Sequence, residues 1–79
     1  MKPQNQEKYD EVFCTVLDVD KEQLPKMRLK QSEQWDSVSH IALVCALENA
    51  FGIDIEPDDI FDLTSYEEGK TLLADHYDV

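Results

Sequence analysis

The chain has 79 residues and a formal net charge of −11, and 42% of its residues are hydrophobic. A chain of this length forms one domain with a modest core, which leaves little room for a deep cleft between two lobes. The negative charge disfavours binding to nucleic acid or anionic lipid and favours partners with basic surfaces. We therefore expect a single domain over residues 1–79 that acts from an exposed face.

The charge is distributed unevenly along the chain. Residues 1–30 contain six acidic and six basic residues, whereas residues 31–79 contain twelve acidic residues and one basic residue, Lys70. Acidity also keeps small proteins in solution, but this asymmetry favours a role in partner binding for the C-terminal part. Small size and a high like charge further predict a monomer.

The two cysteines and the hydropathy pattern indicate in which cellular compartment the protein is found. Cys14 and Cys45 lie far apart and fit no metal-binding or redox spacing, so we expect free thiols. No apolar run approaches the length of a membrane span, and the N-terminus shows no signal-peptide core. These features predict a cytoplasmic protein that does not associate with membranes.

The first predicted element is a helix at roughly 4–18. Its apolar residues recur at the spacing of one helix face, and they are Tyr9, Val12, Phe13, Val16 and Leu17. Residues 19–35 break this pattern, since Pro25 disfavours helical backbone at the residue before it. We expect a long ordered loop here, held to the core by Leu24, Met27, Leu29 and Trp35.

A second helix is predicted from Ser37 to Phe51. Asp36 is a good N-cap, because its carboxylate accepts backbone N–H groups of the first turn. Gly52 follows where a left-handed residue ends a helix at little cost. The face expected to meet the core consists of Leu43, Leu47 and Phe51.

A short third helix is predicted at about 57–62, with Pro57 in its first turn. We expect Ile60 and Phe61 to face the core and Leu63 to fill it. The acidic residues should face mostly outward, and they are Asp58, Asp59 and Asp62.

A last helix should follow a cap at Thr64 or Ser65, which Glu67 or Glu68 would complete as a capping box. Its inner face is predicted to consist of Leu72, Leu73 and Tyr77. Strand signals are nearly absent. The sequence therefore predicts an all-α fold, a four-helix bundle with three longer helices and one short third helix.

The segment from Trp35 to Gly52 carries a resemblance. An Asp36-Ser37-Val38 triplet opens an amphipathic helix that ends in Phe-Gly, and the acidic stretch IDIEPDDIFD at 53–62 follows. This pattern is similar to that of the acyl carrier protein family, and the resemblance covers nearly the whole chain. It implies a carrier with no catalytic activity of its own.

The resemblance also implies a cofactor and the residue that holds it. A phosphopantetheinyl transferase would move 4'-phosphopantetheine from coenzyme A onto the hydroxyl of Ser37, and the arm's thiol would hold an acyl group as a thioester. Asp36 would belong to the motif that docks the transferase. The first turn of a helix is a favourable place for the phosphate of such an arm. Without the resemblance, Asp36 and Ser37 are read simply as the residues that start and cap a helix.

His40 lies three residues after Ser37 and shares its helix face. Three interpretations are open: a Ser–His nucleophile pair, a contact to the phosphate of the arm, or a solvated residue at a partner-facing edge. No orienting acid or oxyanion hole is apparent for the first. His76 and the acidic stretch could suggest a metal site, but the acids lack the glycine and spacing of a calcium loop.

Partner binding is predicted for an apolar edge that leads away from Ser37 and for the acidic residues near it. Alternatively, the apolar residues simply lie at the edge of the hydrophobic core. The residues are Val38, Ile41, Cys45, Glu48, Asp58 and Asp59. Expected partners are the transferase, an acyl- or aminoacyl-loading ligase, and an acyltransferase or synthase with a basic docking patch.

The chain departs from the pattern of fatty-acid-synthesis carriers, which have acids along the second helix. Here the corresponding stretch holds Ser39, Ala42 and Asn49, and only Glu48 keeps a carboxylate. Acidity has moved to the following link and short helix. This predicts a specialised carrier for a dedicated pathway. Alternatives are an aminoacyl or peptidyl carrier, an unmodified acidic adaptor, and a small hydrolase that uses Ser37 and His40.

Overall fold

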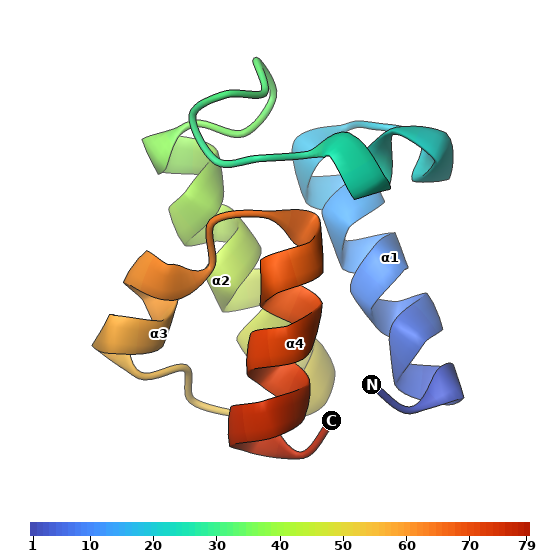
Figure 1. Ribbon diagram of the computed structural model, residues 1–79, viewed down its shortest axis with the longest axis vertical. Coiled ribbons are helices and arrows are strands. Elements are labelled where there is room, and N and C mark those ends of the chain that lie inside the picture. Colours follow the sequence, from blue (N-terminus) through green and yellow to red (C-terminus); the bar gives the residue numbers. More distant parts are fainter.

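The computed structural model describes residues 1–79 and consists of helices joined by ordered loops (Figure 1). In chain order the elements are α1 (Pro3–Leu17), the 3₁₀-helix η1 (Lys21–Lys26), α2 (Ser37–Phe51), α3 (Pro57–Asp62) and α4 (Tyr66–Tyr77). The all-α prediction is confirmed, and the predicted bounds of the second and third helices agree with the observed ones. The 3₁₀-helix η1 lies within the predicted loop and was not expected from the sequence.

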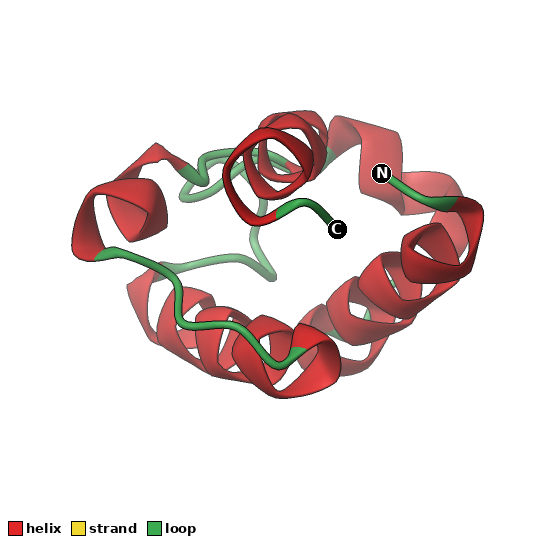
Figure 2. Ribbon diagram, turned by 90° about the horizontal axis from the view of Figure 1, so that it is seen from below, coloured by secondary structure: helices red, strands yellow, loops and turns green.

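The arrangement places the two termini together at one end of the molecule (Figure 2). The backbone N–H of Lys2 donates to the carbonyl of Val79 at 2.9 Å. The start of α2 lies at the opposite end (Figure 1). No helix is both long enough and apolar enough to cross a membrane.

The core forms where α1, α2 and α4 meet the loop before α2. Its fully buried side chains are Tyr9, Phe13, Leu24, Trp35, Leu43, Leu47, Leu63 and Leu73. Phe13 is the centre of an aromatic group, with the rings of Trp35 and Tyr66 edge-on to it at centroid distances of 5.3 and 5.5 Å. Edge-to-face packing of this kind adds to the stabilisation that burial provides.

The loop between α1 and α2 is ordered, as predicted, because both side chains and backbone attach it to the rest of the chain. Leu24 and Met27 are buried in the core. The N–H of Leu29 donates to the carbonyl of Thr64 at 2.9 Å, and the N–H of Tyr66 donates to the carbonyl of Met27 at 3.1 Å. These bonds join the loop to the start of α4.

Two predictions about α3 are wrong. Phe61 is 79% exposed, although it was expected in the core, and Asp59 is only 8% exposed, although it was expected to face outward. Asp59 and Leu63 lie four residues apart and so point the same way, while Phe61 is rotated by roughly 200° from Asp59 around the helix. Once Leu63 fills the core, Asp59 must turn inward and Phe61 outward.

The ends of α2 and α4 follow the predicted capping chemistry. Gly52 adopts a left-handed backbone with φ of 65° and ends α2. The Ser65 hydroxyl accepts the N–H of Glu68 at 3.0 Å, which caps α4. Only this half of the predicted capping box is formed. Gly52 thus fixes where α2 ends, and Ser65 fixes where α4 begins.

Gly69 of α4 leaves room for the hydroxyl of Tyr9 from α1. The hydroxyl of Tyr9 donates to the carbonyl of Tyr66 at 2.7 Å. Burial raises the pKa of Tyr9, which therefore remains protonated as the donor. A Cβ atom on residue 69 would overlap that hydroxyl.

We expect Gly69→Ala to lower the free energy of unfolding by about 1–3 kcal/mol, because α4 must move or Tyr9 must give up its hydrogen bond. Gly52→Ala is the control, since a Cβ there meets no atom within 4 Å. Only its left-handed backbone opposes the change, at a cost of about 1 kcal/mol. Urea unfolding measures both, and a Gly69→Ala variant as stable as the wild type would contradict this packing.

Candidate functional site

The start of α2 presents an exposed serine. Ser37 is the first residue of α2, and its side chain faces solvent, as predicted. Asp36 is the N-cap: its carboxylate accepts the backbone N–H of Ser39 at 2.8 Å and the Ser39 hydroxyl at 3.0 Å. The cap holds the first turn of the helix in place, so the position of Ser37 is fixed.

A groove of about 480 Å³ begins at this serine and runs between α2, α3 and the preceding loop. Half of its lining is apolar, and Lys30 is the only charged residue in it. The lining residues are Leu29, Lys30, Ser37, His40, Ile41, Ile60, Phe61 and Thr64. A second hollow, of about 370 Å³ between α1 and α2, contains none of the predicted site residues.

His40 is buried, so the interpretation that it is a solvated residue at a partner-facing edge is wrong. It is 6% exposed, and both ring nitrogens have partners. Nδ1 accepts the indole N–H of Trp35 at 3.0 Å, and Nε2 lies 2.8 Å from the carbonyl oxygen of Ile60. Because both nitrogens are engaged, the ring lacks a free acceptor for the proton of Ser37, which removes support for a hydrolase.

The apolar edge beside Ser37 is exposed. Val38 is 80% exposed and Ile41 59% exposed, and Cys45 also faces solvent. These residues lie on neighbouring turns of α2. Phe61 extends this apolar surface across the groove on α3, a contribution that the sequence analysis missed. A helix of six residues offers too few positions for periodicity to identify its buried face.

The predicted acidic partner residues differ in their surroundings. Asp58 is exposed. The carboxylate of Glu48 instead accepts the backbone N–H of Ile55 at 2.8 Å and is half-buried. It therefore ties the link after α2 back onto that helix, a structural role that no sequence pattern indicated. Asp59 is also engaged inside the protein.

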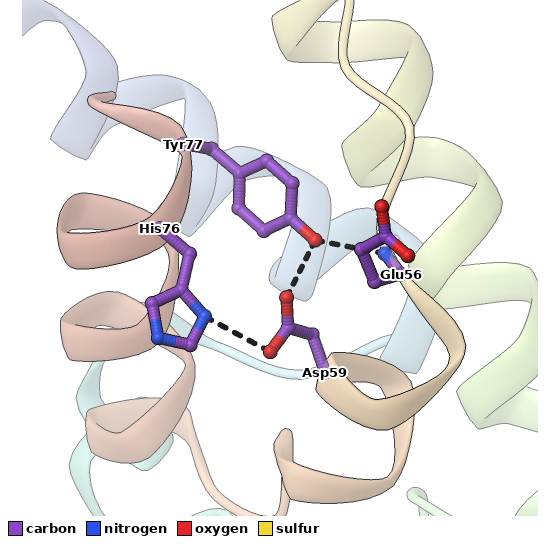
Figure 3. Close-up of polar contacts among 4 residues, drawn as sticks. All are labelled: Glu56, Asp59, His76 and Tyr77. Carbon is purple, nitrogen blue, oxygen red and sulfur yellow. Dashed lines mark hydrogen bonds and ion pairs between the residues drawn. The ribbon is translucent and has the colours of Figure 1, made fainter.

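Figure 3 shows how Asp59 joins α3 to α4. One carboxylate oxygen accepts the hydroxyl of Tyr77 at 2.6 Å, and the other lies 2.9 Å from Nδ1 of His76. The Tyr77 hydroxyl also accepts the backbone N–H of Glu56 at 2.8 Å. Burial, and then the hydrogen bond to the Asp59 carboxylate, raise the pKa of Tyr77. These contacts hold the α3 wall of the groove against α4.

The pKa of Asp36 reports on the cap beside Ser37. The backbone N–H of Ser39, and then its hydroxyl, lower the pKa of the Asp36 carboxyl. The folded pKa is thus below the unfolded value of about 3.9. The cap's contribution to stability is therefore present above that value and is lost as the pH falls through the folded pKa.

We expect Ser39→Ala to raise the titration midpoint of the Asp36 carboxyl part of the way towards its ordinary value, because one of its two hydrogen bonds from Ser39 is removed. Carboxyl NMR over the acid range measures this midpoint. The backbone bond remains, so α2 should still begin at Ser37. An unchanged midpoint would show that the hydroxyl does not bind the carboxylate in solution.

Comparison with known proteins gives one match. The family model described as a phosphopantetheine attachment site matches residues 10–69. No curated protein and no solved structure matches the chain. The matched residues include the loop, all of α2 and α3, and the groove.

Proposed function

The chain belongs to the phosphopantetheine attachment site family, and we propose that it is an acyl carrier protein whose arm is attached to Ser37. Members of this family carry 4'-phosphopantetheine covalently. They are generally carriers rather than catalysts. Ser37 would be esterified by a phosphopantetheinyl transferase that uses coenzyme A, and Asp36 would help to dock that enzyme.

The choice of Ser37 is supported by a comparison of the exposure and side-chain hydrogen bonds of the four serines in the chain. Ser32 is half-buried and accepts the N–H of Arg28, Ser39 donates to Asp36, and Ser65 is 4% exposed and caps α4. Ser37 is exposed and has no side-chain hydrogen bond to lose. Its place at the start of a 15-residue helix favours the negative charge of a phosphodiester.

The groove supports an acyl cargo over an aminoacyl one. It begins at Ser37, and its apolar side chains are Leu29, Ile41, Ile60 and Phe61. An acyl chain that enters it removes apolar surface from water. An aminoacyl group would bring a charged ammonium towards Lys30, the one charged residue of the groove. An aminoacyl carrier is therefore the second candidate. An unmodified adaptor would have no ligand for the groove.

Partner enzymes would dock on the exposed apolar edge formed by Val38, Ile41 and Cys45, with Phe61 beside it. The flanking acids would attract a basic patch, such as one on an acyl-loading ligase, an acyltransferase or a synthase. Asp58 is exposed and supports this role, joined by Asp54, Glu56 and Asp62. Glu48 and Asp59 make internal bonds, so we no longer assign them to docking.

Incubation with a broad-specificity transferase and coenzyme A tests the attachment site. We expect one arm-sized mass increase in the wild type and in Ser39→Ala, and none in Ser37→Ala, because only Ser37 presents a free hydroxyl at the helix start. Circular dichroism shows whether each variant is folded. An unmodified wild type would favour the adaptor, and modification of Ser37→Ala would place the arm on another residue.

The distribution of acids predicts which enzymes accept the modified protein. We expect general fatty-acid elongation enzymes to extend it at least about tenfold less efficiently than their own carrier, because Glu48 is the only acidic residue within α2 and its carboxylate is bound to the backbone of Ile55. The double variant Ala42→Glu/Asn49→Glu adds acids at two exposed positions of α2 and should recover part of the loss. Efficient elongation of the unaltered protein would contradict the specialised role.

A further inference from the structure

His40 connects three parts of the chain around the groove. It lies within α2, it binds Trp35 in the loop before α2, and it binds the backbone of Ile60 in α3. The Trp35 side chain is fully buried and His40 is 6% exposed, so water offers little replacement for either bond. Buried polar groups that lose a partner are costly.

The two partners determine which nitrogen of His40 carries the proton. The indole of Trp35 only donates a hydrogen bond, so Nδ1 must accept it. The carbonyl of Ile60 only accepts, so Nε2 must donate. The ring is therefore neutral, with its proton on Nε2, and acts as acceptor on one side and donor on the other. The ring thus spans the space between a core indole and the backbone of α3.

The two hydrogen bonds of His40, to Trp35 and to Ile60, form a bridge that sets the width of the groove. Ile60 and Phe61 form its α3 wall, and His40 and Ile41 form its α2 wall. Two side chains of α2 hydrogen-bond to the segment 53–62, and they are Glu48, at the link, and His40, at α3 itself. Asp59 fixes the far side of α3 to α4. The bond from His40 therefore controls how closely the α3 wall approaches α2.

We propose that His40 is a positioning residue for the cargo: by holding the carbonyl of Ile60, it fixes the width of the groove and so determines which acyl groups are enclosed. The inference rests on the proposed function, since it takes the occupant of the groove to be the acyl group on the arm of Ser37. His40 itself touches no reacting atom. Long acyl groups, which reach along the α3 wall, depend on it, whereas an acetyl group does not.

Three variants separate the bridge from simple core packing. His40→Ala removes acceptor and donor together and leaves two buried groups unpaired. His40→Gln keeps an acceptor oxygen and a donor amide on a side chain of similar reach. Trp35→Phe keeps the aromatic packing but removes the indole N–H. The wild type and His40→Gln should behave alike, and the other two should share a defect.

The first measurement needs no arm. In amide hydrogen exchange, His40→Ala should speed exchange in α3 and the link by about fivefold or more relative to the wild type, the equivalent of one hydrogen bond. Exchange in α1 and α4 should change little. Trp35→Phe should have less effect in the His40→Ala background than alone, because the two residues share one bond. Equal acceleration in every helix would show an ordinary core residue and overturn the proposal.

The second measurement concerns the cargo. Acetyl and octanoyl arms are attached to each protein, and hydroxylamine cleavage of the thioester is compared with that of the free acyl-pantetheine. The wild type should protect octanoyl but not acetyl. His40→Ala and Trp35→Phe should lose octanoyl protection by about fivefold, with acetyl unchanged and His40→Gln close to the wild type.

The outcomes distinguish the inference from the function on which it rests. A wild type that takes the arm but protects neither cargo would contradict the role of the groove, and a wild type that takes no arm would contradict the carrier. If the wild type and all three variants protect the octanoyl thioester equally well, the role of His40 alone is contradicted. Should His40→Ala fail to fold, Trp35→Phe and His40→Gln still give opposite results if the proposal is right.

Discussion

The burial of Trp35 is the constraint on which the site depends. Its ring is fully buried, edge-on to Phe13 of α1, and its indole N–H is bonded to His40. Because the next residue, Asp36, caps α2, this anchor fixes where the helix begins and brings Ser37 to the surface. The burial of this one aromatic side chain therefore determines the positions of the loop, the Asp36 cap, Ser37 and the groove. The backbone N–H of Lys30 also donates to the Trp35 carbonyl at 2.7 Å, which closes the loop beside the groove.

The longer helices and the exposed serine could be predicted because the signals for them are local. Apolar spacing defines α1 and α2, and Asp36 and Gly52 define the ends of α2. The exposure of Ser37 follows from its place in the first turn. Each of these conclusions needs only residues within a few positions of one another. The order of the 19–35 loop could also be inferred, since its apolar residues had to be buried somewhere.

The features that sequence reasoning missed depend on residues far apart in the chain. Helix geometry turns Asp59 to the same side as Leu63, and its carboxylate can be buried there because His76 and Tyr77 of α4 bind it. His40 is buried because Trp35 and Ile60 accommodate both of its nitrogens, and Phe61 is exposed because Asp59 and Leu63 take the inner face of α3. Polar residue types suggested solvent in the first two cases. Tertiary hydrogen bonds that satisfy the polar groups reversed that expectation.

The central claim is tested most directly by producing the protein in cells that also contain a transferase and by locating the arm on the purified chain. Trypsin cleaves after Lys30 and Lys70, so one peptide, residues 31–70, contains all four serines. Tandem mass spectrometry of this peptide should place the phosphopantetheine on Ser37. A modification found on Ser32, Ser39 or Ser65, or a peptide that stays unmodified throughout, would contradict the account.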